Sequence, residues 1–392
     1  MTDRSRKIAF VGNFGFWHRG TLGYRTLPMA RELMALGHRV VVIAPPWDSP
    51  GEPIGKGIEW DVTVRRIETP RARPGLRGHA LIAARLARAL VAERPDVIVA
   101  VKPIAYAGLI APLLGWLPKP RIVVDTDDWE GRGGWSDLAS LAPLERALIR
   151  LQEQIALRSA HHVIVASHEL DRLVGTLGVP ANRRSYVANA TWPGLATWRA
   201  LGTEIAPDVD LVVYSRLFEF DHARFVSLLS RLVAARPSLS VRVLGASIGD
   251  ESTALRARLV EAGLRERVEF VGWVERESIA VSLRRGRVAL ALLDDTRVNR
   301  ARCSVKMLDL MLAECTIIAE GVGEVRHFLA DGATALLATP GDGAALAKAV
   351  LTLLDDAPLA RALAIAAGRV ARERFTWESQ RDILARAILG AD

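Results

Sequence analysis

The chain has 392 residues, of which half are hydrophobic, 24% are charged and 6% are aromatic. This composition excludes a disordered chain, a collagen-like repeat and a disulfide scaffold, and at about 100–200 residues per domain the length predicts two domains. The formal net charge of +8 favours a partner with negative charge, such as a nucleotide, a membrane surface or a nucleic acid.

The cysteines and the N-terminus predict a cytoplasmic protein. Cys303 and Cys315 lie outside Cys-x-x-Cys and Cys/His ligand spacings, so we expect free thiols and no metal site. The N-terminal sequence MTDRSRKIAFVG lacks the apolar stretch of a signal peptide. The longest apolar run, residues 104–117, is too short to span a bilayer and contains Pro112.

In the first half of the chain, short β-rich runs alternate with longer segments of helical periodicity. This alternation predicts a parallel sheet with helices on both faces, in a domain over residues 1–190. The predicted strands are 7–12, 39–44, 96–101, 121–125 and 162–166, and the predicted helices are 22–36, 81–92, 105–114 and 144–158.

The periodicity lapses over residues 191–208, which contain prolines and glycines and are interpreted as a linker. The alternation then resumes in a second domain, 209–375, and a final helix over 378–389 lies in a C-terminal segment, 376–392, expected to pack toward the first domain. The second domain has predicted strands 210–214, 240–244, 268–271 and 288–293, and predicted helices 222–235, 252–261, 275–283, 304–313 and 343–354. In such folds ligands bind at the carboxyl ends of the strands, so we expect a cleft between the domains.

The loop after the first strand contains Gly20 and Gly23 and leads into a helix. Glycines let the backbone approach a ligand closely, and free N–H groups at a helix N-terminus attract an anion. The spacing matches neither a Walker A loop nor the dinucleotide fingerprint. A purely structural loop is the alternative.

Four carboxylates stand within six residues at the end of the strand 121–125: Asp125, Asp127, Asp128 and Glu130. Their mutual repulsion is tolerated more readily where they meet a cation, a hydroxyl group or a reacting centre. This pattern favours a functional loop over a solvated acidic one.

The second domain places Arg216 just after its first strand and Ser304, Lys306 and Asp309 around one predicted helix start. Ser304 is a suitable N-cap, and Lys306 and Asp309 would lie on one helical face. The helix amides and the ammonium group could bind phosphate while the carboxylate accepts sugar hydroxyls. An exposed Lys–Asp pair is the alternative.

The order of these passages resembles the GT-B glycosyltransferases, and among them the retaining family-four, or E-x(7)-E, group. The passages are GHRVVVIAPP, HHVIVASHEL followed by YVANA, EFVGWVE, and SVKMLDLMLAECTIIAEGVGEVRHFLADGATALLATPGD. The resemblance implies two doubly wound Rossmann-like domains that face each other across a cleft. It also implies transfer of a sugar from a nucleotide-diphosphate donor to a hydroxyl of a glycan or glycolipid, with retention and without a metal or other cofactor.

The resemblance also implies roles for single residues. Asp127 stands where the group's D-x-H-[DE] stretch has histidine, and Ala301 stands where its first glutamate would be. The catalytic candidates are Asp127, Asp128, His18, Arg216 and Lys306, and the donor-binding candidates are Gly20, Arg216, Trp273, Val274, Ser304, Lys306 and Asp309.

The segment 71–92 is rich in arginine and carries Ile82, Leu86 and Leu90 at a spacing of four. A basic amphipathic helix of this kind could lie on an anionic membrane and meet a lipid-linked acceptor. An ordinary surface helix with an apolar inner face is the interpretation that its alanine content favours.

Three other functions are compatible with parts of the sequence. A degenerate transferase would bind the nucleotide sugar, or act as a scaffold, without turnover. A sugar-nucleotide epimerase would convert the donor without an acceptor. A nucleic-acid-binding protein agrees with the charge, but the arginines are dispersed and no nucleic-acid motif occurs.

Overall fold

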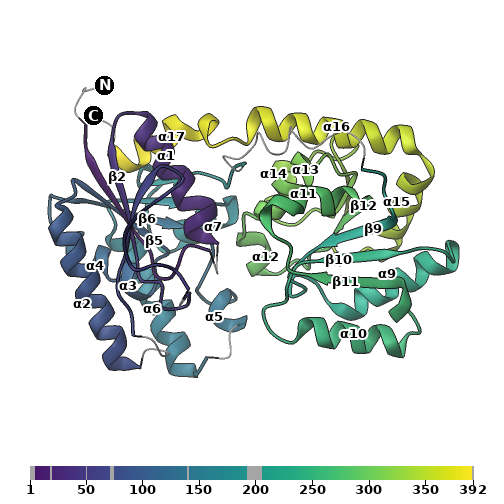
Figure 1. The fold of residues 1–392 in the computed structure, drawn as a ribbon, viewed down its shortest axis with the longest axis horizontal. Helices are drawn as coiled ribbons and strands as arrows, with labels where there is room; N and C mark the ends of the chain where they lie inside the picture. The colour runs from purple at the N-terminus through teal and green to yellow at the C-terminus, as the bar shows by residue number, and fades with distance from the viewer. Residues whose placement is uncertain are drawn as a thin grey trace. The chain divides into compact units, whose positions relative to one another are not determined.

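The computed structural model describes residues 5–17, 20–49, 51–70, 75–138, 141–191 and 205–390, which form two compact α/β units (Figure 1). Unit 1 comprises Met1–Trp192, Ala301–Cys303 and Trp377–Asp392, and unit 2 comprises Pro193–Arg300 and Ser304–Thr376. Within the described part of the chain, no helix is long and apolar enough to cross a bilayer.

Unit 1 is built on an eight-stranded sheet with the strand order β3-β4-β2-β1-β5-β6-β7-β8. All neighbouring strands are parallel except β3 and β4, so the expectation of a purely parallel sheet is wrong at this edge. Trp60 and Asp61 join these two strands with φ values of 48° and 67°, the left-handed backbone of a tight hairpin turn. The strands are β1 (Lys7–Val11), β2 (Arg39–Ala44), β3 (Gly55–Glu59), β4 (Val62–Arg66), β5 (Val97–Val101), β6 (Arg121–Thr126), β7 (His162–Val165) and β8 (Arg184–Tyr186).

Two predicted helices of unit 1 are each divided in two. The predicted helix 22–36 is a π-helical turn, Leu22–Thr26, followed by α1 (Leu27–Ala35), because Pro28 has no N–H to continue the helical ladder. The predicted helix 105–114 is broken at Leu109 into α3 (Ala105–Gly108) and α4 (Ile110–Leu114), and Pro112 in α4 has no N–H to bond to the carbonyl of Gly108. The other helices are α2 (Leu76–Glu93), α5 (Trp135–Leu138), α6 (Pro143–Ser159), α7 (His168–Thr176) and α17 (Arg381–Leu389), with a 3₁₀ turn at Ala181–Arg183 and another at Glu378–Gln380.

The apolar strands of unit 1 are buried on both faces, as a parallel sheet requires. Helices α1 and α17 cover one face of the sheet (Figure 1). Side chains at alternate strand positions, such as Phe10 and Val42, pack in the core beneath these two helices. Helices α2, α3, α4 and α6 cover the other face (Figure 1). Leu384 and Ile388 of α17 complete the first of these two layers.

Besides α17, a second segment distant in sequence, Ala301–Cys303, packs into unit 1. The carbonyl of Ala301 accepts a hydrogen bond from Ser167 Oγ at 2.6 Å, and the carbonyl of Cys303 accepts one from Asn189 Nδ2 at 2.6 Å. These contacts place residues 301–303 with unit 1, although they fall within the sequence range assigned to the second domain. Of the expected linker, residues 192–204 lie outside the described part of the chain.

Unit 2 carries a six-stranded parallel sheet with the order β11-β10-β9-β12-β13-β14. Helices α9, α10 and α15 cover one face, while α11 and α13 cover the other (Figure 1). The sequence did not indicate the short strands β13 and β14 or the alanine-rich α16. The strands are β9 (Val209–Tyr214), β10 (Val241–Leu244), β11 (Val268–Gly272), β12 (Gly286–Ala291), β13 (Ile317–Glu320) and β14 (Leu336–Ala338). The helices are α9 (His222–Ala235), α10 (Glu251–Glu261), a 3₁₀ turn (Arg265–Arg267), α11 (Arg276–Arg284), α12 (Arg297–Ala301), α13 (Val305–Leu312), α14 (Val325–Phe328), α15 (Gly343–Asp355) and α16 (Ala357–Arg374).

Candidate functional site

Unit 1 gathers three acidic side chains around Lys102 at the carboxyl ends of β5 and β6. Lys102 Nζ lies 2.6 Å from Asp128 Oδ2, 3.2 Å from Asp127 Oδ1 and 3.7 Å from Glu130 Oε1. Each of the four side chains is at most 18% exposed. The acidic loop is therefore a buried cluster around a cation, and the alternative of a solvated loop is wrong. Sequence reasoning missed Lys102, although its place directly after a buried strand was a signal.

The cluster drives the pKa values of its two aspartates apart. Burial works to lower the pKa of Lys102, but the three carboxylates outweigh it and raise that pKa. Burial raises the pKa of Asp127, and Asp128 and Asp125 add to this effect against the opposing pull of Lys102. The pKa of Asp128 is lowered, because Lys102 and Arg302 outweigh its burial. Two neighbouring acids whose pKa values shift in opposite directions form an arrangement suited to proton handling.

Asp125, the first acid of the loop, has a structural role. Its carboxylate accepts two hydrogen bonds from Arg25, at 2.9 Å from Nε and 2.7 Å from Nη2. Arg25 also donates to Asn189 Oδ1 and to the carbonyl of Val187, and both charged side chains are buried. Because every one of these contacts lies inside unit 1, Asp125 anchors the strand end and leaves Asp127 and Asp128 as the candidates for chemistry.

Glu153 of α6 contacts the backbone of the acidic loop. It is fully buried, and its Oε1 accepts a hydrogen bond from the backbone N–H of Glu130 at 2.9 Å. Burial raises the pKa of Glu153 to about 8. A Cβ atom on Gly131 would lie 2.5 Å from the ring of Trp129 and 2.8 Å from Glu153 Oε2, so glycine lets the loop pass close to both side chains.

The glycine loop after β1 reaches the acidic loop through Thr21, whose Oγ1 donates to Asp127 Oδ2 at 3.3 Å. Gly20 is buried with φ at 79°, and a Cβ atom there would lie 2.8 Å from the ring of Tyr24. The amides of Gly23 and Tyr24 bond to the carbonyls of Phe16 and Gly20. These two amides are thus engaged within the loop, contrary to the expectation of free N–H groups. His18 lies outside the described residues.

In unit 2, one buried acid organises the loop after β9. Glu219 Oε2 accepts hydrogen bonds from Ser215 Oγ at 2.6 Å and from the backbone N–H of Arg216 at 2.9 Å. Glu219 Oε1 lies 2.5 Å from Lys306 Nζ. The predicted residues Arg216 and Lys306 are thereby brought together by a carboxylate that sequence reasoning missed. Its place just past the carboxyl end of β9 was the available signal.

Asp309 does not form the exposed pair with Lys306 that was the alternative prediction. It is 1% exposed, and its Oδ2 accepts a hydrogen bond from Arg276 Nη1 at 2.8 Å. Burial raises the pKa of Asp309 against the opposing effect of Arg276 and Lys306. Ser304 occupies the predicted N-cap position of α13, although its side chain makes no capping hydrogen bond.

Two of the donor-binding candidates, Trp273 and Val274, follow β11. Trp273 is 60% exposed and Val274 is half-buried. An exposed indole ring offers an apolar face on which a planar base can stack. The structure leaves the ring of Trp273 accessible, and the donor-binding role of this segment stays a prediction.

Helix α2 uses its apolar face for packing. Ile82, Leu86 and Leu90, the residues on which the membrane hypothesis depended, are all buried within unit 1. Residues 71–74 of the basic segment lie outside the described part of the chain. The apolar stripe of α2 is therefore unavailable to a bilayer.

Cys303 and Cys315 are buried free thiols. Among the residues described by the structure, no group of three His, Cys, Asp or Glu side chains is positioned to hold a metal ion.

Family models for glycosyltransferases match both halves of the chain. Residues 20–190 match the glycosyl transferase 4-like domain, and residues 209–356 match the glycosyl transferases group 1. A phosphatidyl-myo-inositol mannosyltransferase from Mycobacterium leprae is 30% identical over 137 residues, which cover 35% of this chain and 34% of that protein. The chain thus matches about a third of the length of this relative.

Solved structures resemble the whole chain. A sucrose-phosphate synthase from Thermosynechococcus elongatus has a TM-score of 0.72 at 20% identity, with 97% of each chain covered. The Anabaena protein Alr3699/HepE in complex with UDP and glucose has a TM-score of 0.70 at 18% identity and covers 98% of this chain and 100% of that one. Residues 20–190 and 209–356 thus each match a glycosyltransferase family model, and the chain has the GT-B fold of these solved structures.

Proposed function

We propose that the protein transfers a sugar from a nucleotide-diphosphate donor bound by unit 2 to a hydroxyl group of an acceptor bound by unit 1. One observation carries this proposal: the buried Glu219, just past the carboxyl end of β9, pairs with Lys306 and accepts a hydrogen bond from the backbone N–H of Arg216. Ligands of open α/β sheets bind at that edge. The UDP and UDP-glucose complexes of the Anabaena relative support a nucleotide-sugar donor.

Negative charge develops on the diphosphate as the sugar leaves, and preorganised cations stabilise that charge. Arg216 and Lys306 supply such cations, and α13 begins one residue before Lys306. A helix N-terminus favours a negative charge, so we include the first amides of α13 in the proposed site. We assign the diphosphate to these groups and propose that transfer proceeds without a divalent metal. Transfer rates that are equal in EDTA and in Mg²⁺ would support this assignment, and loss of transfer in EDTA would contradict it.

The acceptor side of the proposal rests on Asp127. Thr21 and Lys102 fix the position of its carboxyl group, and we assign to this group the contact with a sugar or acceptor hydroxyl. In a retaining reaction the leaving phosphate takes the acceptor proton, whereas an inverting reaction needs a carboxylate base here. We propose retention. The anomeric configuration of the product, read by NMR, decides between the two mechanisms.

A thermal-shift screen against UDP, GDP, dTDP and ADP, with their common sugars, tests donor binding directly. A ligand at 100 times its Kd stabilises the fold by about 2.7 kcal/mol, so a selective shift identifies the base. Slow hydrolysis of the bound sugar nucleotide then supports a transferase. Binding without turnover under any acceptor condition would favour a scaffold protein, and the absence of every shift would contradict the proposed donor site.

We further propose that the acceptor is carried on a lipid. Two exposed apolar stripes support this assignment, because large exposed apolar surfaces mark contact sites. One stripe lies on α6 and the other on α3 and α4, which pack against α6. The exposed residues are Leu144, Leu148, Leu151 and Ile155 on α6, and Leu109, Leu113 and Trp116 around α4.

Cosedimentation with phosphatidylcholine vesicles tests the lipid assignment. The double variant Leu148→Ser/Leu151→Ser should lose most vesicle binding, since it removes two apolar side chains from one stripe. Val260→Ser, which changes an exposed apolar residue of unit 2, serves as the control. Equal sedimentation of the native chain with and without vesicles would refute the lipid-bound acceptor and leave the donor assignment intact.

A further inference from the structure

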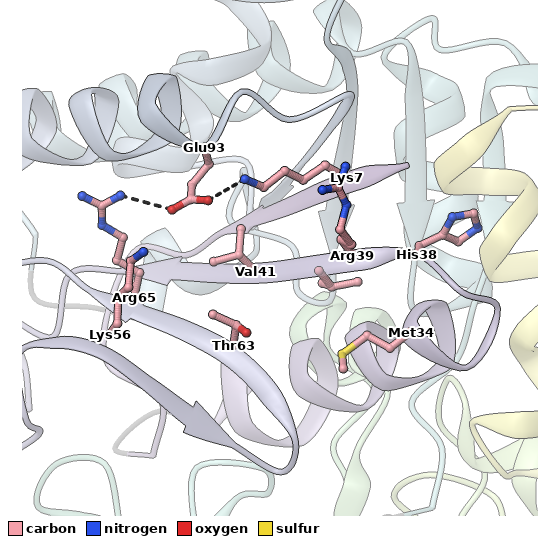
Figure 2. Close-up of a pocket in the computed structure, with 10 residues that line it drawn as sticks. Lys7, Met34, His38, Arg39, Val41, Lys56, Thr63, Arg65 and Glu93 are labelled. Atoms are coloured by element: carbon pink, nitrogen blue, oxygen red, sulfur yellow. Dashed lines mark hydrogen bonds and ion pairs between the residues drawn. The ribbon is translucent and has the colours of Figure 1, made fainter. Parts of the chain in front are cut away.

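A pocket with a volume of about 370 Å³ lies in unit 1 near the starts of β1 and β2. Lys7 and Arg39 are the first residues of these strands, whereas Lys102 and Asp127 of the candidate site follow the ends of β5 and β6. In a parallel sheet these are opposite edges. Residues lining the pocket are Lys7, Met34, His38, Arg39, Val40, Val41, Lys56, Thr63, Arg65 and Glu93 (Figure 2).

Positive charge dominates the pocket. Its lining contains the cations Lys7, Arg39, Lys56 and Arg65, and Glu93 is its one carboxylate. Burial and the nearby Arg6 lower the pKa of His38, which therefore adds no charge at neutral pH. The lining thus carries an excess of three positive charges.

The sheet register sets these cations beside one another in like-charged pairs. Lys7 is the cross-strand partner of Arg39 on β1 and β2, and Lys56 is the partner of Arg65 on β3 and β4. Like charges directly opposite each other destabilise a sheet. Two such pairs around one hollow are best explained by an anion that the pocket is built to receive.

Glu93 forms ion pairs with only two of the four cations that line the pocket. Its carboxylate lies 2.7 Å from Lys7 Nζ and 3.3 Å from Arg65 Nη1, as the dashed lines in Figure 2 show. The side chains of Arg39 and Lys56 make no hydrogen bond or ion pair with any other residue that the structure describes, and Lys56 acts on Glu93 only through longer-range attraction. Both side chains are exposed, so they can move toward a ligand.

The pocket also has an apolar part. Val41 lies between the two groups of cations in Figure 2, and Met34 borders the hollow from α1. Thr63 contributes a hydroxyl group. We propose that this pocket is a second ligand site that binds a phosphate group attached to a small organic moiety. Guanidinium and ammonium groups take the phosphate oxygens, and Val41 and Met34 contact the carbon portion.

Such a phosphate can belong to a soluble metabolite or to a lipid headgroup, and two titrations separate these sources. The first measures binding of inorganic phosphate and of glycerol 3-phosphate to the full chain by calorimetry. The second measures cosedimentation with phosphatidylcholine vesicles that contain or lack phosphatidylglycerol.

The test variant is Arg39→Gln/Lys56→Gln, and the control is Arg231→Gln/Lys348→Gln, which removes the same charge from exposed positions of unit 2. The test variant should lose about tenfold or more of the affinity in whichever titration shows saturable binding, because each cation makes charge-assisted contacts. The control should stay within about twofold of the native chain. Lys306→Ala is titrated in parallel, since the donor site proposed in unit 2 also carries a cation.

Loss of binding in the test variant alone supports the site and, by the titration in which it occurs, identifies the source of the phosphate. Absence of saturable binding in both titrations would overturn the proposal. So would equal losses in the test and control variants, or binding that disappears in Lys306→Ala and persists in Arg39→Gln/Lys56→Gln. None of these outcomes depends on sugar transfer, so the second site and the proposed function fail separately.

Discussion

The ammonium group of Lys306 lies 2.5 Å from the carboxylate of Glu219, and the same carboxylate accepts the backbone N–H of Arg216. One buried acid therefore joins the strand end of β9 to the first turn of α13, about 90 residues further along the chain. Of the two residues proposed to meet a diphosphate, this acid therefore holds Lys306 by its ammonium group and Arg216 by its backbone.

Replacing Lys306 or Arg216 with alanine should lower turnover by about 10²-fold or more, because each variant removes a charge that stabilises the leaving diphosphate. Steady-state rates of donor hydrolysis or transfer measure this loss. Lys348→Ala, which removes an exposed cation from α15 of the same unit, should leave the rate unchanged. Native rates in both site variants would show that the diphosphate binds elsewhere.

Asp127→Asn should reduce transfer by about 10²–10⁴-fold, the contribution typical of a positioned acid or base. Nucleotide affinity should stay nearly native, because Asp127 belongs to unit 1 and the proposed donor groups belong to unit 2. The asparagine can still accept the hydrogen bond from Thr21. Calorimetric titration with the nucleotide and a transfer assay separate the two properties.

Asp61→Asn is the matched control, since Asp61 is an exposed aspartate of the same unit. It should retain both nucleotide affinity and transfer. A fully active Asp127→Asn variant would remove Asp127 from the mechanism.

Lys102→Met should destabilise unit 1 by about 3–5 kcal/mol at pH 7, because it leaves buried carboxylates without their cation. The pKa of Asp128 is lowered in the folded state, so its ion pair stabilises the fold fully above the unfolded pKa of about 3.9 and loses this effect as the pH falls through the folded value. The difference in free energy of unfolding between the native chain and Lys102→Met should therefore decrease below about pH 4. Urea unfolding at pH 7 and at acidic pH measures it, with the exposed Lys119→Met as control. A deficit independent of pH would mean that packing, and not charge, explains the loss.

Glu153→Gln should stabilise the protein increasingly as the pH rises from 5 to 8. The folded pKa of about 8 lies above the value of the unfolded chain, so ionisation of the native glutamate opposes folding over this interval. Linkage gives a change of about 1.4 kcal/mol per pH unit at most. Glutamine keeps an oxygen to accept the N–H of Glu130.

Melting temperatures of the native chain and of Glu153→Gln, compared across this pH range, test the effect. Glu145→Gln changes an exposed glutamate of the same helix and should follow the native curve. Parallel curves for the native chain and Glu153→Gln would show that Glu153 is already ionised in the folded protein.

The fold was largely predictable because its central strands, such as β1 and β5, are uninterrupted apolar runs bounded by polar residues. Edge strands could not be predicted in the same way. Strand β3 has the sequence GKGIE, with a single large apolar residue, and its pairing depends on the left-handed turn at Trp60–Asp61. Single-residue roles at strand ends, such as those of Asp127 and Lys306, followed from motif order and remain predictions.

The partners of these residues could not be predicted, because they come from distant segments. Lys102 lies 26 residues from Asp128, and Glu219 lies 87 residues from Lys306. Neither spacing forms a local motif. Asp125 and Asp127 look equivalent in sequence, and only the position of Arg25 gives the first a structural role.

The packing of α17 into unit 1 determines when this unit can finish folding. Leu384 and Ile388 belong to the core beneath α1, yet they leave the ribosome after every strand of both sheets has been synthesised. During synthesis, the apolar face of unit 1 that α17 covers therefore stays exposed until unit 2 has been synthesised. A chain that ends just before Trp377 would contain all of unit 2 but would lack α17, which covers one face of the unit 1 sheet.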